Sequence, residues 1–199
     1  MTSHSDFGEI APEGWPVLAA AGIITILLAF IALPLGGFAL GLMLWLRHIL
    51  RIPVRRVPVD GDVVVAPADG VVTSIERQQQ TEDRHMQDGL PPMARITIRT
   101  GLTDAQLQRA PVTGRVRDNF LIPGLFLGAA DEVTARRDNE RREITLETDA
   151  GEAVMMVQIA TRTARQLICR HGPGRALAAG ASLGMARMGG LTDLFVPAN

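Results

Sequence analysis

Residues 15 to 46 contain no charged side chain, and this apolar run limits the fold more than any other feature. As one continuous helix it would extend roughly 48 Å at 1.5 Å per residue, beyond the ~30 Å hydrocarbon core of a bilayer. Pro34, Gly36 and Gly37 stand near its middle, where a helix kinks or ends. The run therefore predicts a membrane anchor, either a helical hairpin or one long kinked span. We favour the hairpin, because each half alone is too short to cross comfortably; a buried pair of soluble helices is the alternative.

The segments on either side of the run differ in charge. Residues 1–14 form a polar, acidic tail without arginine, so they lack the basic region that opens a secretory signal. Residues 47–57 form a basic connector that contains Arg47, Arg51, Arg55 and Arg56. Such a cluster is attracted to anionic lipid headgroups and favours the cytoplasmic side of a membrane, although a solvated connector has the same composition. We expect an anchor in the inner membrane of the cell, with the rest of the chain on the cytoplasmic side.

Residues 58–199 have a β pattern of short apolar runs separated by turn signals. The expected strands are 63–65, 71–75, 95–99, 144–147, 154–159, 160–170 and a last run that ends at Pro197, with an exposed loop over 76–94. Residues 66–72 and 110–116 share an Ala-Pro-x-x-Gly turn, which suggests two similar units facing each other across a sandwich. The fold class predicted is mainly β: a compact β barrel or sandwich domain, preceded by an N-terminal apolar helical membrane anchor.

Composition excludes several functional classes. Every one of the 20 basic residues is arginine, so no lysine can form a Schiff base with pyridoxal phosphate or a carbonyl substrate. The formal net charge of −1 gives no indication of nucleic-acid binding. Cys169 is the only cysteine, which excludes a disulfide within the chain. The four histidines lack the spacing of metal ligands, and we expect no metal site.

Several separated motifs follow one another in an order that resembles a known family. They are Arg109-Ala-Pro-Val-Thr-Gly, Asp138-Asn-Glu-Arg, Val157-Gln-Ile-Ala and the closing Gly184-Met-Ala-Arg-Met-Gly-Gly-Leu-Thr-Asp-Leu-Phe-Val-Pro. Over residues 50 to 197 the chain is similar to the phosphatidylserine decarboxylases in their short, membrane-anchored form. Members of that family cut themselves at a Gly-Ser bond, and the serine becomes a pyruvoyl group that serves as the cofactor for decarboxylation.

The resemblance assigns three positions to the self-cleavage step, which follows Ser-His-Asp logic. Asp69 matches the aspartate of the family's Pro-x-Asp-Gly turn. Gln106 stands where the family has histidine, and its amide cannot act as a base near neutral pH. The cleavage turn falls on Gly189 and Gly190, and Gly190 takes the place of the pyruvoyl-forming serine. We therefore expect no pyruvoyl cofactor, and the resemblance by itself leaves open whether the chain is an enzyme.

Four further residues are candidates for a role at this site. Thr192 or Ser182 could replace the missing hydroxyl, but Thr192 lies about 7 Å further along a strand and Ser182 precedes the turn. Arg109 and Arg141 are candidates to bind the phosphate or carboxylate of a lipid headgroup. A surface ion pair is the alternative for both arginines.

Three functions fit these observations. The preferred one is a degenerate decarboxylase homologue in phosphatidylethanolamine metabolism that binds lipid or a partner enzyme. The alternatives are an active decarboxylase with atypical maturation and a structural β module tethered to the membrane. Expected partners are the membrane and an anionic phospholipid such as phosphatidylserine, with no nucleic acid; a homo-oligomer or a complex with an active decarboxylase also fits.

Overall fold

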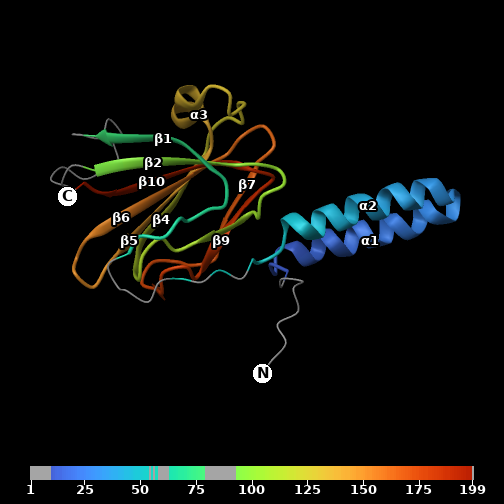
Figure 1. The fold of residues 1–199 in the computed structure, drawn as a ribbon, viewed down its shortest axis with the longest axis horizontal. Helices are drawn as coiled ribbons and strands as arrows, with labels where there is room; N and C mark the ends of the chain where they lie inside the picture. The colour runs from blue at the N-terminus through green and yellow to red at the C-terminus, as the bar shows by residue number, and fades with distance from the viewer. Residues whose placement is uncertain (1–9, 54, 56, 58–62, 79–92, 199) are drawn as a thin grey trace. The chain divides into compact units, whose positions relative to one another are not determined.

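A computed structural model describes residues 10–53, 55, 57, 63–78 and 93–198 of the chain. The chain divides into two compact units, Met1–Arg55 and Arg56–Asn199 (Figure 1). Most of the predicted polar tail and most of the predicted loop over 76–94 lie outside the described residues.

The first unit contains two apolar helices, α1 (Gly14–Ile31) and α2 (Leu33–Ile49). They fold back on each other as a hairpin, since Ile10 bridges Arg51 in antiparallel fashion and the N–H of Ala11 donates to the carbonyl oxygen of Leu50 at 3.1 Å. With 18 residues and high hydropathy, α1 is long and apolar enough to cross a membrane, whereas α2 has 17 residues. The exposed side chains of both helices include many large apolar ones, among them Ile23, Leu27, Phe30, Leu33, Phe38 and Leu44.

The break between the helices lies earlier than the sequence predicts. The chain becomes extended at Ala32, with φ −159° and ψ 130°, and Pro34 then falls in the first turn of α2. Proline is tolerated there because the first N–H groups of a helix have no partner within it. Gly36 continues the helix and allows close packing, because a Cβ at this position would lie 2.5 Å from the Cβ of Ala29.

The second unit is a β sandwich, which confirms the predicted mainly β class. Its described residues form a seven-stranded sheet in the order β1-β2-β10-β6-β5-β4-β8 and a three-stranded sheet in the order β3-β9-β7. All the strand pairs are antiparallel. The strands are β1 (Val71–Gln78), β2 (Met93–Thr100), β3 (Leu107–Arg109), β4 (Gly114–Ile122), β5 (Arg141–Glu147), β6 (Ala153–Ile159), β7 (Gln166–Cys169), β8 (Ala176–Leu177), β9 (Ser182–Arg187) and β10 (Gly190–Pro197).

Some local predictions were wrong. Residues 160–170 do not form one strand, because the chain turns at Thr161, whose N–H donates to the carbonyl of Ala164, and only β7 is extended. Residues 63–65 belong to no strand, although the N–H of Val65 donates to the carbonyl of Pro111 at 2.8 Å. The two Ala-Pro-x-x-Gly turns do not face each other across the sheets. They run side by side, since the N–H of Arg109 donates to the carbonyl of Pro67 at 2.8 Å.

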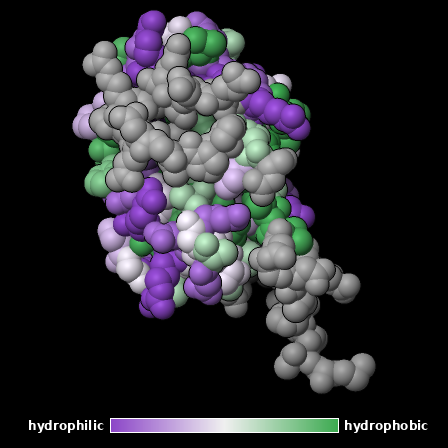
Figure 2. All heavy atoms as spheres, turned by 90° about the vertical axis from the view of Figure 1, so that its left-hand side faces the viewer, coloured by the Kyte–Doolittle hydropathy of each residue, from purple (hydrophilic) through white to green (hydrophobic). Residues whose placement is uncertain are grey.

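The large sheet has an apolar cluster on each face. One cluster lies between the two sheets and includes Ile144, Met156, Leu183 and Leu194. The other includes Val157, Leu191, Phe195 and Ala135, the last of which belongs to the short helix α3 (Glu132–Asp138). Because side chains alternate along a strand, β10 contributes Leu194 to one face and Leu191 and Phe195 to the other. The coloured part of the face seen in Figure 2 mixes hydrophilic and hydrophobic side chains.

Buried charges attach α3 to the large sheet. Arg136 donates from Nε to Asp193 Oδ2 at 2.7 Å and from Nη2 to Thr97 Oγ1 at 2.8 Å. The hydroxyl of Thr97 in turn donates to Asp193 Oδ1 at 2.7 Å. Asp193 is 2% exposed, so its charge depends on these partners rather than on water.

A second acidic group extends this network to the sheet edge. Glu132 accepts hydrogen bonds from Arg99, Arg136 and Thr73. Partial burial alone would raise the pKa of Glu132, but these hydrogen bonds outweigh it and hold the pKa below its ordinary value. Burial alone would lower the pKa of Arg136, but the hydrogen bonds and charges of Asp193 and Glu132 raise it, so the guanidinium stays protonated.

Replacing Arg136 by alanine is expected to destabilise the β domain by about 3 kcal/mol or more, because it leaves Asp193 buried without its cation. Arg137→Ala is the matched control. That side chain is 74% exposed and pairs with its neighbour Asp138, so we expect its removal to change the stability little. Urea unfolding followed by circular dichroism measures both. Equal losses for the two variants would contradict the role given to Arg136.

Candidate functional site

The turn from β9 to β10 is where the sequence places the cleavage site. Met188, Gly189 and Gly190 follow one another with φ values of 68°, 91° and 125°, all in the region that side chains rarely adopt. The structure thus has three successive residues with left-handed backbone at the predicted position. Glycine is the residue that tolerates this geometry at least cost.

Little room for a side chain exists at the turn. A Cβ on Gly190 would lie 3.2 Å from the carbonyl oxygen of Ile159 and 3.3 Å from the Cβ of Ala164. A Cβ on Gly189 would lie 2.9 Å from the carbonyl oxygen of Thr100. Residue 190 therefore combines a strained backbone angle with close neighbours. A serine at this position would be strained and would press on these two neighbours.

Gln106 connects the turn to the loop from Gly101 to Asp104 through three side-chain hydrogen bonds. Its Oε1 accepts from the N–H of Gly189 at 2.5 Å, while its Nε2 donates to the carbonyl oxygens of Gly101 at 3.0 Å and Asp104 at 2.7 Å. Only one orientation of the amide satisfies one donor and two acceptors, so the contacts fix it. The side chain is 1% exposed, and these bonds replace those it would make to water.

Asp69 lies near the same turn, and the connection runs through the end of β2. The hydroxyl of Thr100 donates to the backbone carbonyl of Asp69 at 2.8 Å, and Thr100 pairs with Gly190 across β2 and β10. Gln106 binds the next residue, Gly101. The three positions assigned by resemblance therefore converge around Thr100 and Gly101.

A chain of buried amides continues from the turn into the sandwich. Gln108 donates from Nε2 to Thr192 Oγ1 at 2.9 Å, and its Oε1 accepts from Nε2 of Gln158 at 2.5 Å. All three side chains are at most 2% exposed. Gln158 Oε1 has no partner among the described residues, and flipping the amides along the chain would only leave the Gln158 nitrogen unpaired instead.

Gln108 and Gln158 were not predicted from the sequence to lie at the site. A signal for Gln108 exists, because it stands two residues after Gln106, and side chains two apart in an extended segment point to the same face. Gln158 carries no comparable signal. It joins the site only because β6 pairs with β10, where Gln158 lies opposite Thr192.

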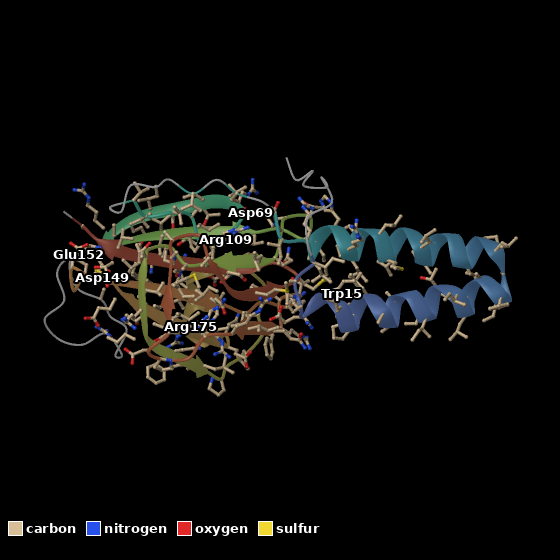
Figure 3. All side chains as sticks on the ribbon, turned by 90° about the horizontal axis from the view of Figure 1, so that it is seen from below. Trp15, Asp69, Arg109, Asp149, Glu152 and Arg175 are labelled. Carbon is tan, nitrogen blue, oxygen red and sulfur yellow. The ribbon has the colours of Figure 1, made fainter. Side chains whose placement is uncertain are left out.

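The two candidate headgroup arginines lie in different surroundings. Arg109 is half-buried in β3 and donates from Nη1 to the carbonyl oxygen of Gly180 at 2.9 Å. Figure 3 places it near Asp69, in keeping with the backbone bond from Arg109 to Pro67. Arg141 pairs with Glu143 at 2.9 Å, and both side chains are largely buried. In the large sheet Arg141 lies opposite Ile159, and Ile159 lies opposite Leu191. Both apolar residues pack in the cluster that contains Ala135, so Arg141 lies on the sheet face that carries α3.

Cofactor chemistry at this site is limited by its residues. Gly190 has no hydroxyl from which a pyruvoyl group could form, and Thr192 is buried with its oxygen already bonded to Gln108. Among the described residues, no group of three histidine, cysteine or carboxylate side chains could hold a metal ion. The thiol of Cys169 is poorly suited to react, because burial raises its pKa.

Comparison with known proteins identifies the family. A sequence model of phosphatidylserine decarboxylase matches residues 42–199. The chain belongs to the phosphatidylserine decarboxylase family. It is 36% identical over 188 residues to the phosphatidylserine decarboxylase proenzyme of Beijerinckia indica, covering 94% of this chain and 79% of that protein. It is 37% identical over 191 residues to the proenzyme of the same name from Geotalea uraniireducens, covering 96% and 86%.

Adding a methyl group at the turn is expected to be costly in this family member. Gly190→Ala should lower the free energy of unfolding by about 1–3 kcal/mol, because alanine is strained at this φ and meets Ile159 and Ala164. Gly128→Ala is the matched control, since a Cβ there meets nothing within 4 Å. Urea unfolding measures both. A Gly190→Ala variant as stable as the control would show that the turn relaxes freely.

Proposed function

We propose that this chain is a membrane-tethered member of the phosphatidylserine decarboxylase family that acts in phosphatidylethanolamine metabolism without self-cleavage and without a pyruvoyl group. Its role is then to bind a serine phospholipid or to associate with an active decarboxylase. The observation that carries this proposal is the contact between Gln106 and Gly189. At the position where the resemblance places a proton acceptor, an amide bonds the backbone of the cleavage turn.

Three features of the site support the loss of self-cleavage. Gly190 supplies no nucleophile, and its backbone angle disfavours any residue that would. All three hydrogen bonds of Gln106 hold main-chain groups, which leaves it no role as a base. The hydroxyl of Thr192 sits inside the sandwich, on the same face of β10 as position 190 but about 7 Å along the strand.

Membrane attachment rests on the first unit. The length and hydropathy of α1 support insertion into a membrane. The many large apolar side chains exposed on both helices support it too, because a patch of this kind is typical of a surface that contacts lipid or protein. Arg47, Arg51 and Arg55 follow the apolar run and favour the cytoplasmic face. We therefore place the protein in the inner membrane, with both ends of the hairpin and the β domain on the cytoplasmic side.

The intact mass of the protein purified from its own host tests the central claim. We expect a single species of full-length mass, because cleavage requires a hydroxyl at the turn. Two chains, with the smaller one starting between Gly190 and Thr192 and blocked at its amino terminus, would overturn the proposal. They would also require chemistry that neither residue provides in the present arrangement.

Reversion variants extend this test. Gly190→Ser alone should remain uncut, because Gln106 cannot take the proton of the new hydroxyl. The double variant Gln106→His with Gly190→Ser restores the family residues beside Asp69, and we expect part of it to be cut before residue 190. Gln106→His alone is the control, and it should stay intact while losing stability. Cleavage of the Gly190→Ser single variant would contradict the assignment of position 106.

Binding of the lipid headgroup can be measured separately from catalysis. Titrating the detergent-solubilised chain with short-chain phosphatidylserine should give saturable binding, and Arg109→Gln should raise Kd on the order of tenfold through the loss of a charge-assisted bond. Arg141→Gln should change Kd less, because Glu143 already pairs with that guanidinium. Circular dichroism controls for folding, since Arg109 also binds Gly180. Absence of binding together with co-purification of a serine-bearing decarboxylase would favour the partner role.

A further inference from the structure

The helix hairpin forms a groove between α1 and α2. The groove has a volume of about 500 Å³ and is lined by residues of both helices: Pro16, Val17, Ala20, Ala21, Ile24 and Thr25 of α1, and Ala39, Leu42, Met43 and Leu46 of α2. A volume of this size is within the range of sites that hold small molecules.

The two helices touch on either side of this groove. Near the tip of the hairpin, a Cβ on Gly36 would lie 2.5 Å from the Cβ of Ala29. At the open end, a Cβ on Gly14 would lie 3.1 Å from the Cβ of Leu50. These close contacts at both ends fix the distance between the helices. The small side chains between the contacts do not fill that distance, so a groove remains.

The lining of the groove is suited to hydrocarbon. Its one hydroxyl, that of Thr25, donates to the carbonyl oxygen of Ala21 within α1 at 2.8 Å and needs no further partner. The other lining side chains are apolar. Water in this groove would find no unsatisfied donor or acceptor among these side chains, whereas an alkyl chain would gain dispersion contacts on two sides.

A basic cluster begins where the groove ends. Arg47 stands four residues after Met43, one turn further along the same face of α2, and Arg51 follows after four more residues. The Nη1 of Arg51 donates to the carbonyl oxygen of His48, which keeps its guanidinium at the end of the helix. Between residues 10 and 55 the chain has three arginines and a single acidic residue, Glu13, so this end of the hairpin attracts anions.

We propose that the groove binds one acyl chain of an anionic phospholipid, whose phosphate is held by Arg47 and Arg51. The inference rests on the membrane insertion proposed above, but not on the fate of the cleavage turn. Apolar lining accounts for the chain and the arginines account for the headgroup. A zwitterionic lipid would fill the groove equally well but would gain less from the two guanidinium groups.

The chain carries its own reporter for this site. Its two tryptophans both belong to the hairpin, and Trp15 and Trp45 directly adjoin the groove residues Pro16 and Leu46 (Figure 3 labels Trp15). The full chain is reconstituted in phosphatidylcholine bilayers that contain increasing fractions of brominated phosphatidylglycerol, and tryptophan quenching gives the relative affinity of the two lipids. We expect phosphatidylglycerol to be preferred roughly fivefold for each arginine engaged.

Two sets of matched variants make the test specific. Ala20→Phe fills the groove and should reduce the preference several-fold, whereas Ala19→Phe, at an exposed neighbouring position outside the lining, should leave it unchanged. Arg47→Gln and Arg51→Gln should each reduce the preference, whereas Arg77→Gln on the exposed surface of β1 should not. Comparison of these matched variants separates the groove from a general effect of hydrophobicity or charge.

Specific outcomes would overturn the inference. Equal quenching by brominated phosphatidylcholine and phosphatidylglycerol would do so, as would equal effects of Ala19→Phe and Ala20→Phe. Quenching that depends on the protein-to-lipid ratio would instead indicate that a second hairpin fills the groove. A chain that alkaline carbonate releases from membranes would contradict the proposed membrane attachment, while a cleaved but membrane-embedded chain would contradict only the proposed loss of maturation.

Discussion

The hydrogen bond between the amide of Gln106 and the N–H of Gly189 is the interaction on which the arrangement of the β domain depends. It fixes the turn from which β10 starts, and β10 pairs with β2 along its whole length and with β6 over residues 191–195. A shift of one residue at the turn would exchange the two faces of β10. Leu194 would then leave the inner core, and Asp193 would lose Arg136. The local geometry at residues 188–190 is therefore also a constraint on both apolar clusters.

Much of the fold could be predicted from the sequence because its signals are local. The charge-free run at 15–46 requires apolar helices, and alternating or β-branched runs mark β1, β2, β5, β6 and β10. The helix α3 was missed, although Asp131 provides a signal: its carboxylate caps the helix by accepting from the N–H of Thr134. Its seven residues are too few for a clear apolar period, and Ala135 is the only one of them that is buried. Such a helix is stabilised by tertiary contacts, and a local sequence pattern gives no information about these contacts.

The candidate site also has features that the sequence predicts and features that only the structure shows. The turn, Asp69 and Gln106 could be located by motif order, because each is tied to a short stretch with fixed spacing. Their meeting point could not, since it depends on the pairing of β2 with β10 and on the loop from Gly101 to Gln106. The pairing of Arg141 with Glu143 illustrates the same limit. The sequence offers two arginines as headgroup candidates, and only the structure shows that Arg141 pairs with Glu143 whereas Arg109 lies beside the Asp69 turn.

Positions 106 and 190 are physically linked at this turn, because Gln106 binds the N–H of Gly189 next to Gly190. Residue 106 faces two carbonyl oxygens and one N–H, and an amide supplies the required two donors and one acceptor. A neutral imidazole has one donor and one acceptor, so it would leave one carbonyl without a partner, and a protonated one has no acceptor for Gly189. Glutamine therefore satisfies these buried groups better than histidine would. Glycine at 190 likewise suits the backbone at φ 125° better than serine. Glutamine at 106 and glycine at 190 thus both stabilise the turn in its present conformation, and this stabilisation is what supports the proposed absence of self-cleavage.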